Sequence, residues 1–196
     1  NSNLFSEDFY HFFSRNICSL IEKKFGPTWN QRPLEVSGFY PVNNELNCLL
    51  IMEGMAKQAP NLRFSLPIVP EQGKVLTFQR YVKDKLIAGK FNVMIPSQEC
   101  EQVIPDVILT PLLVFDKFCH RIGYGGGYFD STIQSIRAHK KPDLVAIGVA
   151  FDVQEHDSIP AEDHDSVLDA IVTESRVILP EKLVPSSGNT SLNLHL

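Results

Sequence analysis

The sequence predicts an α/β fold with a largely parallel central sheet. Residues 106–111, DVILTP, are a continuous β-branched and apolar run, as expected for a strand buried on both faces of such a sheet. A glycine-rich loop and a helical pattern over residues 129–139 follow, and LVAIGVA at 144–150 is a second buried run. A strand, a crossover helix and another strand form a βαβ unit, so the two strands should be parallel and the crossover right-handed.

The rest of the chain predicts further helices and strands. Apolar residues recur at spacings of three and four after Ser6, which is the expected N-cap, and Gly26 with the following proline should end this first helix. A second amphipathic helix is expected over residues 44–59, capped by Asn43 or Asn44. Strands are expected at residues 34–40, 63–69, 75–81 and 170–173.

Composition limits the organisation and the partners. The 196 residues are 43% hydrophobic and 21% charged, which suits one globular domain over residues 1–180 followed by a polar tail at 181–196. The net charge of -5 argues against nucleic-acid or anionic-membrane binding, because both use broad positive fields. No apolar run approaches the roughly 20 residues of a spanning helix. We therefore expect a cytoplasmic monomer that binds small molecules.

Four cysteines, Cys18, Cys48, Cys100 and Cys119, lie far apart without a CxxC spacing. This pattern signals neither a zinc ribbon nor a redox pair. We expect reduced, buried thiols that act as small hydrophobic side chains.

The stretch RIGYGGGYFD, residues 121–130, carries the strongest chemical signal. It matches neither the Rossmann fingerprint, which needs glycine where Tyr128 stands, nor a P-loop. Glycines between a strand and a helix still let the backbone and the helix-start amides approach an anion. Arg121 adds a planar fork for phosphate oxygens, and Asp130 a carboxylate that Mg²⁺ could bridge to a triphosphate. The alternative is a tight turn with Asp130 as a first-turn charge and Arg121 on the surface.

A second concentration of acid, HDSIPAEDHD, covers residues 156–165. It could bind a transition metal, be a solvated acidic loop, or supply one carboxylate to the Mg²⁺ at Asp130. Asp165 is best placed for the last role, because Val167 and Leu168 re-enter the core directly after it. The candidate transition-metal ligands are His156, Asp163, His164 and Asp165.

The segment DVILTPLLVFDKFCHRIGYGGGYFD, residues 106–130, resembles the signature of the 5-formyltetrahydrofolate cyclo-ligases, also called methenyltetrahydrofolate synthetases. Weaker likenesses are FYPVNNELNCLL from Phe39, LPIVP, LTFQRY, FNVMIP near Phe91, AIGVAFDVQ and HDSVLDAIVTE. The resemblance implies a three-layer αβα fold of the type shared with sugar-phosphate isomerases and CoA transferases.

The resemblance also implies a reaction. The formyl oxygen of 5-formyltetrahydrofolate attacks the γ-phosphate of ATP, in the presence of Mg²⁺, and the phosphorylated intermediate closes to 5,10-methenyltetrahydrofolate with release of ADP and phosphate. Arg121 would be catalytic, and Asp130 and Asp165 would hold the metal. The matching ATP-binding positions are Arg121, Ile122, Gly123, Tyr124, Gly125, Gly126, Gly127, Tyr128 and Phe129. The matching folate-binding positions are Tyr40, Glu45, Phe91, Tyr124 and Tyr128.

The sequence departs from the family pattern in places. Phe118 and Cys119 replace a small polar turn that usually contains glycine, and Met94-Ile95 replaces Pro-Glu. The family usually opens with a helix that carries a Lys and an Arg, which nothing before Phe9 matches, so we expect a basic segment upstream. Two other hypotheses stay open: a non-catalytic phosphometabolite-binding module on the same fold, and a metal hydrolase built on residues 156–165.

Overall fold

The structure is a computed structural model that describes residues 5–42, 45–90, 93–160, 162 and 165–181. In this part of the chain, eight strands form the central sheet in the order β12-β11-β10-β7-β1-β2-β3-β6. They are β1 (Leu34–Ser37), β2 (Leu62–Ile68), β3 (Thr77–Arg80), β6 (Gln102–Val103), β7 (Val107–Thr110), β10 (Val145–Val149), β11 (Ala170–Val172) and β12 (Val177–Ile178). The helices are α1 (Glu7–Phe25), α2 (Cys48–Gln58) and α3 (Tyr128–His139), with 3-10 turns η1 (Trp29–Gln31), η2 (Lys83–Lys85) and η4 (Asp152–Gln154).

Five neighbouring strands, from β11 through β10, β7 and β1 to β2, run parallel. Val107 of β7 is in register with Val36 of β1 on one side and with Val145 of β10 on the other. The outer strands β12, β3 and β6 are antiparallel to their neighbours. The prediction of a largely parallel sheet is therefore confirmed.

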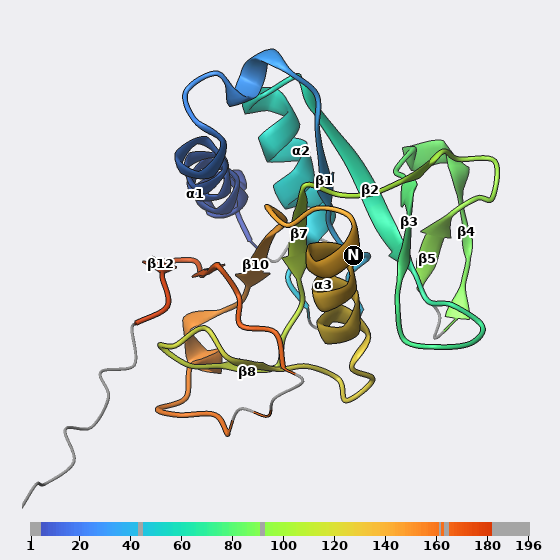
Figure 1. The fold of residues 1–196 in the computed structure, drawn as a ribbon. Helices are drawn as coiled ribbons and strands as arrows, with labels where there is room; N and C mark the ends of the chain where they lie inside the picture. Colours follow the sequence, from blue (N-terminus) through green and yellow to red (C-terminus); the bar gives the residue numbers. More distant parts are fainter. Residues whose placement is uncertain (1–4, 43–44, 91–92, 161, 163–164, 182–196) are drawn as a thin grey trace, which may run out of the picture.

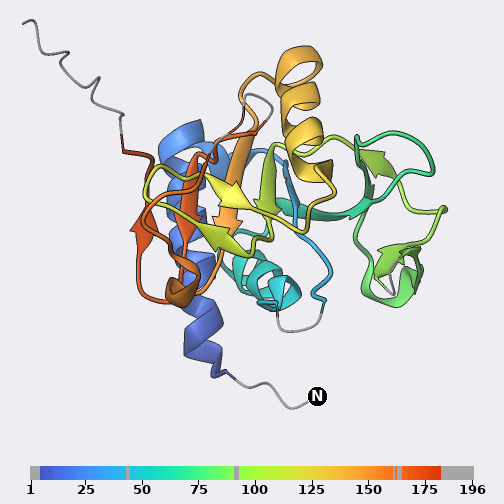
Figure 2. The same cartoon turned by 90° about the horizontal axis from the view of Figure 1, so that it is seen from below.

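The sheet separates two hydrophobic cores, and so the fold has three layers (Figure 2). Val107 and Leu109 of β7 belong to the core under α1 and α2, whereas Ile108 between them belongs to the core under α3. Successive strand residues point to opposite faces, so a strand covered on both faces is apolar throughout. This confirms the three-layer αβα architecture.

The limits of the first two helices follow local side-chain chemistry. The Ser6 hydroxyl accepts a 3.3 Å hydrogen bond from the Phe9 amide, and Gly26 with a φ of 83° ends α1, as predicted. The second helix begins at Cys48 with Asn47 at its N-cap, later than predicted. The predicted caps, Asn43 and Asn44, lie outside the described residues.

Two hydrogen bonds precede this late start. The amide of Val42 donates to the Glu45 carboxylate at 2.7 Å, and the Glu45 amide donates to the Val42 carbonyl at 3.1 Å. These bonds involve the backbone and the side chain of Glu45, and they fix the position of its carboxylate.

The short strands were the main omission of the sequence analysis. The hairpins β4 (Leu86–Ala88) with β5 (Met94–Pro96) and β8 (Val114–Phe115) with β9 (Arg121–Ile122) lie outside the central sheet (Figure 1). The edge strands β6 and β12 were missed too. Strands of two or three residues are too short to show a period of two. The β8–β9 hairpin matters most, because it places Arg121 on a strand.

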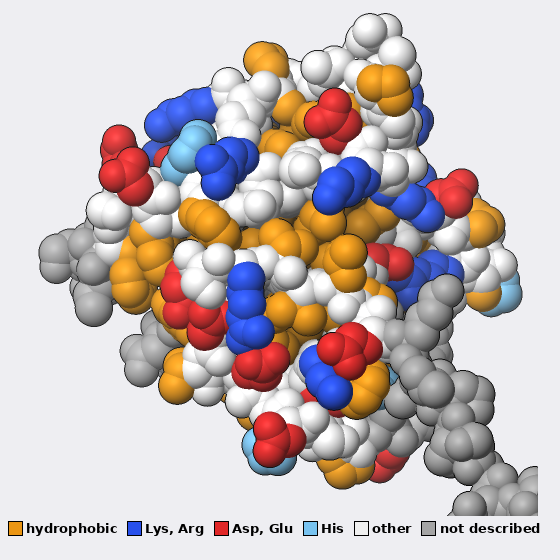
Figure 3. All heavy atoms as spheres, turned by 90° about the vertical axis from the view of Figure 1, so that its left-hand side faces the viewer, with side chains coloured by type: hydrophobic (Ala, Val, Ile, Leu, Met, Phe, Trp, Pro, Cys, Tyr) orange, Lys and Arg blue, Asp and Glu red, His pale blue; other side chains and the backbone are white. Residues whose placement is uncertain are grey.

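The described residues confirm the expectation for the cysteines, since all four are free and buried. None of the described helices is long and apolar enough to cross a membrane. On the face at the left of Figure 1, acidic and basic side chains are interspersed around hydrophobic surface (Figure 3). The polar tail expected at 181–196 falls almost wholly outside the described residues, and it stays a prediction.

Candidate active site

A pocket of about 340 Å³ lies at the carboxyl edge of the parallel strands. Open α/β sheets bind their ligands at this edge, because loops from neighbouring strands diverge there. Phe39 follows β1, residues 111–113 follow β7, and Phe151 follows β10, and all of them line the pocket. Tyr124 of the glycine loop and Glu45, which lies before α2, complete the wall of the pocket.

The glycine loop runs from β9 to α3. Gly125 and Gly127 have φ angles of 84° and 64°, in the left-handed region that side chains disfavour. A Cβ on Gly126 would lie 2.6 Å from the Tyr128 ring, so any side chain at this position would force the ring to shift. Gly127 is the N-cap of α3, and no side chain caps the first turn. The amides at this helix start are therefore available to an anion.

Arg121, Asp130 and Ser166 form a compact cluster beside the loop. The Arg121 Nη2 atom lies 2.8 Å from Asp130 Oδ1, and its Nη1 donates to the Ser166 carbonyl at 2.9 Å. The Ser166 amide donates to Asp130 Oδ1 at 3.1 Å. Burial lowers the pKa of the Arg121 guanidinium, an effect that the carboxylates of Asp130 and Asp165 oppose. The arginine stays charged, but both of its terminal nitrogens have partners within the protein.

Asp165 is brought to this cluster by its neighbour Ser166. Its charge acts on Arg121, and its Oδ2 accepts a 2.8 Å hydrogen bond from the Glu162 amide. Mg²⁺ in proteins commonly takes one or two carboxylates and completes its shell with water and phosphate oxygens. A pair of carboxylates such as Asp130 and Asp165 fits that donor set; Asp130 contacts Arg121 directly, and the charge of Asp165 acts on the same guanidinium.

Tyr124 and Glu45 connect the glycine loop to the pocket. Partial burial, a hydrogen bond to Glu45 and the charge of Glu45 raise the pKa of Tyr124 to about 12. The phenol therefore stays protonated at neutral pH and donates to the carboxylate. Because the Val42 amide also binds Glu45, the carboxylate has a fixed position at the pocket wall.

The structure places the other predicted site residues in different surroundings, and not all of them line the pocket. The Tyr128 ring packs beside Gly126 in the loop. Tyr40 is half-buried and does not line the 340 Å³ pocket. Ile122 is exposed on β9, and Phe129 is half-buried against the core under α3. Phe91 lies outside the described residues.

The acidic run at 156–165 gains no support as a transition-metal site. Among the described residues there is no group of three or more His, Cys, Asp or Glu that could hold a metal. The His156 ring lies 3.1 Å from the Ser158 carbonyl, a local contact. Asp163 and His164 lie outside the described residues.

Sequence reasoning missed two residues that shape the site. The Ser166 carbonyl accepts from Arg121 and the Ser166 amide donates to Asp130. No sequence motif around Ser166 predicts these backbone hydrogen bonds. Gln154 lines the pocket and donates to the Leu112 carbonyl at 2.8 Å, which ties η4 to the segment after β7. It lies within AIGVAFDVQ, whose likeness to the family was the available signal.

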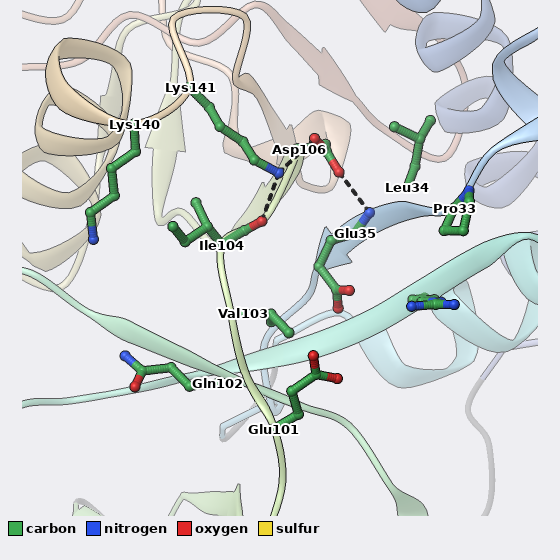
Figure 4. A pocket seen from close by; sticks show the side chains of 11 residues that line it. Pro33, Leu34, Glu35, Glu101, Gln102, Val103, Ile104, Asp106, Lys140 and Lys141 are labelled. Carbon is green, nitrogen blue, oxygen red and sulfur yellow. Dashed lines mark hydrogen bonds and ion pairs between the residues drawn. The ribbon is translucent and has the colours of Figure 1, made fainter.

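A larger cavity, of about 580 Å³, lies at the opposite edge of the sheet (Figure 4). Its charges largely satisfy one another: Lys141 lies 2.7 Å from Asp106, whose other oxygen accepts from the Glu35 amide at 2.9 Å. Arg80 bridges Glu35 and Glu101 at 3.2 and 2.9 Å. The glycine loop does not contribute to this cavity, so we take the smaller pocket as the candidate site.

A glycine-rich loop and an uncapped helix start beside a pocket at the carboxyl edge of a parallel sheet place the protein among the α/β proteins whose ligand site lies at this edge. The comparisons with known proteins are more specific. Residues 18–174 match the model of the 5-formyltetrahydrofolate cyclo-ligase family. The chain belongs to this family, which confirms the predicted family and enzyme class.

Similar proteins of known name point to the same family. The chain is 29% identical over 148 residues to the 5-formyltetrahydrofolate cyclo-ligase of Escherichia coli K12, covering 72% of this chain and 79% of the relative. It is 27% identical over 158 residues to the Haemophilus influenzae enzyme of the same name, covering 78% of each. The fold is similar to that of Aquifex aeolicus 5,10-methenyltetrahydrofolate synthetase, with a TM-score of 0.63, 23% identity and coverage of 94% and 91%.

Proposed function

We propose that this protein converts 5-formyltetrahydrofolate to 5,10-methenyltetrahydrofolate with consumption of ATP. The observation that carries the proposal is the position of the glycine loop: the Arg121–Asp130 pair closes its base, and its Tyr124 contacts Glu45 at the pocket. One loop thus borders both a place for phosphates and a place for a flat organic ligand. The family membership supports the same reaction.

The chemistry needs both substrates in line. The formyl oxygen attacks the γ-phosphorus, the bond from that phosphorus to the ADP oxygen breaks, and N10 then attacks the activated formyl carbon. The carbon–oxygen bond breaks last, and inorganic phosphate leaves. A formamide oxygen leaves poorly until it is phosphorylated, so catalysis consists mainly of positioning and of charge stabilisation.

Arg121 and the loop amides supply these functions in our proposal. The amides at the start of α3 hold phosphate oxygens, and Arg121 contributes a fixed positive charge beside them. In the structure Arg121 is bound to Asp130 and to the Ser166 carbonyl. We infer that a bound triphosphate competes with Asp130 for the guanidinium, which frees the Asp130 carboxylate for a metal.

Asp130 and Asp165 would hold Mg²⁺, which would neutralise the charge of the phosphate chain. Without ligand, Arg121 is paired with Asp130. With ATP and the metal bound, Arg121 would be paired with phosphate and Asp130 with the metal, so neither side chain would be left as an unpaired charge. An unpaired buried charge, by contrast, costs several kcal/mol. The paired state seen here is therefore compatible with the proposed role of Asp130.

The folate would lie at the pocket wall. Glu45 presents a fixed carboxylate suited to the N–H groups of the pterin, and Tyr124 and Tyr128 offer aromatic surface. The proposed roles of Tyr40 and Phe91 rest on the resemblance to the family. A monomeric state and a cytoplasmic location stay predictions.

The test is to mix the protein with ATP, Mg²⁺ and 5-formyltetrahydrofolate and to record the absorbance of the methenyl chromophore. We expect product only when ATP and the formyl folate are both present. Methenyl product without ATP would contradict the mechanism. Phosphate binding without any product would favour the non-catalytic binding module.

A further inference from the structure

We propose that Lys74, on the connection between β2 and β3, is a phosphate-binding residue that faces the glycine loop. This inference rests on the proposed ATP-dependent function and extends it to a residue outside the 121–130 stretch. Residues 69–76 follow the carboxyl end of β2, the same edge of the sheet that carries the candidate site. Lys74 therefore approaches the loop from the carboxyl end of another strand of the sheet.

The position of the Lys74 side chain relative to Gly127 is the first observation. Its Nζ lies 3.5 Å, and its Cδ 3.8 Å, from the place that a Cβ would take at Gly127. Gly127 is the left-handed N-cap of α3. The ammonium therefore lies beside the helix start whose amides we assign to the phosphates.

The connection that carries Lys74 is anchored to the same helix. The amide of Leu76, two residues further on, donates to the Thr132 hydroxyl at 2.8 Å, and this hydroxyl donates to the Tyr128 carbonyl. Both Leu76 and Thr132 are buried. The anchor therefore keeps the base of the Lys74 side chain in register with the first turn of α3.

Charge is the third observation. Lys74 is exposed and forms no ion pair with any described residue, whereas both terminal nitrogens of Arg121 are bound within the protein. A triphosphate carries several negative charges, and the protein as a whole is acidic, with a net charge of -5. An ammonium on a flexible stem is a point charge with three donors, which suits phosphate oxygens that approach from solvent. Unlike Arg121, Lys74 can therefore bind a phosphate without first losing a partner within the protein.

Two substitutions test this role. Lys74→Met keeps most of the length of the side chain and removes its charge, whereas Lys74→Arg keeps the charge. The matched control is Lys140→Met, which makes the same change in net charge at the opposite end of α3. Because Lys74 and Lys140 are both exposed, all three variants should fold, which circular dichroism would verify.

Kinetics give the first readout. We expect Lys74→Met to raise the KM for ATP about tenfold or more, as for one charge-assisted contact, with little change in the KM for folate. Lys74→Arg should recover most of the loss, and Lys140→Met should behave as the wild type. An unchanged KM for ATP in Lys74→Met, an equal shift in Lys140→Met, or a shift confined to the folate would overturn the inference.

Calorimetric titration with inorganic tripolyphosphate gives a second readout that does not depend on turnover. We expect wild-type protein to bind this probe, and Lys74→Met to bind it about tenfold more weakly. The same loss in a protein that makes no methenyl folate would uphold Lys74 while the proposed function fails. Equal binding by an active wild type and by Lys74→Met would overturn the role of Lys74 alone.

Discussion

The guanidinium of Arg121 and the carboxylate of Asp130 form a 2.8 Å ion pair across the glycine loop, and the arginine side chain is only 4% exposed. The loop between them is therefore closed at its base by an ion pair with a buried arginine rather than by backbone bonds alone. Ser166 strengthens this closure, because its carbonyl accepts from Arg121 and its amide donates to Asp130.

Replacing Arg121 by Lys should reduce turnover clearly, because Lys keeps the charge but cannot bind Asp130 and Ser166 with two separate nitrogens. Loss of one charge-assisted hydrogen bond corresponds to about 1.5–3 kcal/mol. Steady-state kinetics at saturating ATP would measure the effect, and the binding of folate should hardly change.

A matched control exists for this substitution. Arg176 also pairs with two carboxylates, Asp152 and Glu155, but its side chain is 45% exposed and lies outside the candidate pocket. Arg176→Lys should leave turnover unchanged. Wild-type turnover in Arg121→Lys at saturating ATP would place Arg121 outside the catalytic machinery.

Asp130→Asn and Asp165→Asn should each raise the Mg²⁺ concentration needed for half-maximal rate. If both carboxylates hold one ion, the double variant should deviate strongly from additivity. Titration of the rate with Mg²⁺ at fixed ATP measures this. Unchanged Mg²⁺ dependence in Asp165→Asn would show that Asp165 does not bind the metal, and residues 156–165 would then be a solvated acidic loop.

Gly127→Ala should destabilise the fold by about 1–2 kcal/mol, because alanine would have to adopt the left-handed φ of 64° at this N-cap. Gly123 is the control, since its φ is not in that region and nothing lies within 4 Å of a Cβ placed there. Urea unfolding of both variants provides the comparison. Equal losses of unfolding free energy would mean that the loop adopts another conformation.

The cysteine thiols should react slowly in the native protein. Burial raises the pKa of Cys18 to about 11, and mainly burial raises those of Cys48 and Cys119 to about 12. At pH 8 a thiol reagent should therefore label these residues only after unfolding. Rapid labelling of more than one thiol in the native protein would contradict this burial.

The raised pKa values also set a pH dependence. Unfolded thiols ionise near pH 8.5, below the native values, so the unfolded state loses its protons first. The contribution of these thiols to the free energy of unfolding should be full below about pH 8.5 and should be lost as the pH rises toward 12. Urea unfolding at pH 7.5 and pH 10 would show the decrease, and substitution of Cys48 by Ala should reduce it.

The elements that the sequence predicted well carry strong local signals. Residues 106–150 hold two long apolar runs on either side of a helical pattern, and β7, α3 and β10 lie there. The first helix has both a side-chain cap at Ser6 and a glycine stop at Gly26. Periodicity and end signals together suffice when an element is long and its ends are marked.

The parts that the sequence missed depend on tertiary contacts. Ser166 lies 45 residues from Arg121 along the chain, so nothing local could announce that its carbonyl binds the guanidinium. Cys119 stands before Arg121 in a turn that usually contains glycine in the family. It has a φ of 62°, a conformation that glycine adopts easily, so the turn keeps a glycine-like backbone with a buried side chain on it.

The most direct test of the account is the ratio of ADP to methenyl product in one reaction that contains protein, Mg²⁺, ATP and 5-formyltetrahydrofolate. Absorbance of the methenyl chromophore and chromatography of the nucleotides would be measured on the same samples. We expect one ADP for each methenyltetrahydrofolate, and no ADP when the formyl folate is omitted. Steady ADP formation without folate, or methenyl product without ADP, would contradict a phosphoryl transfer that activates the formyl group.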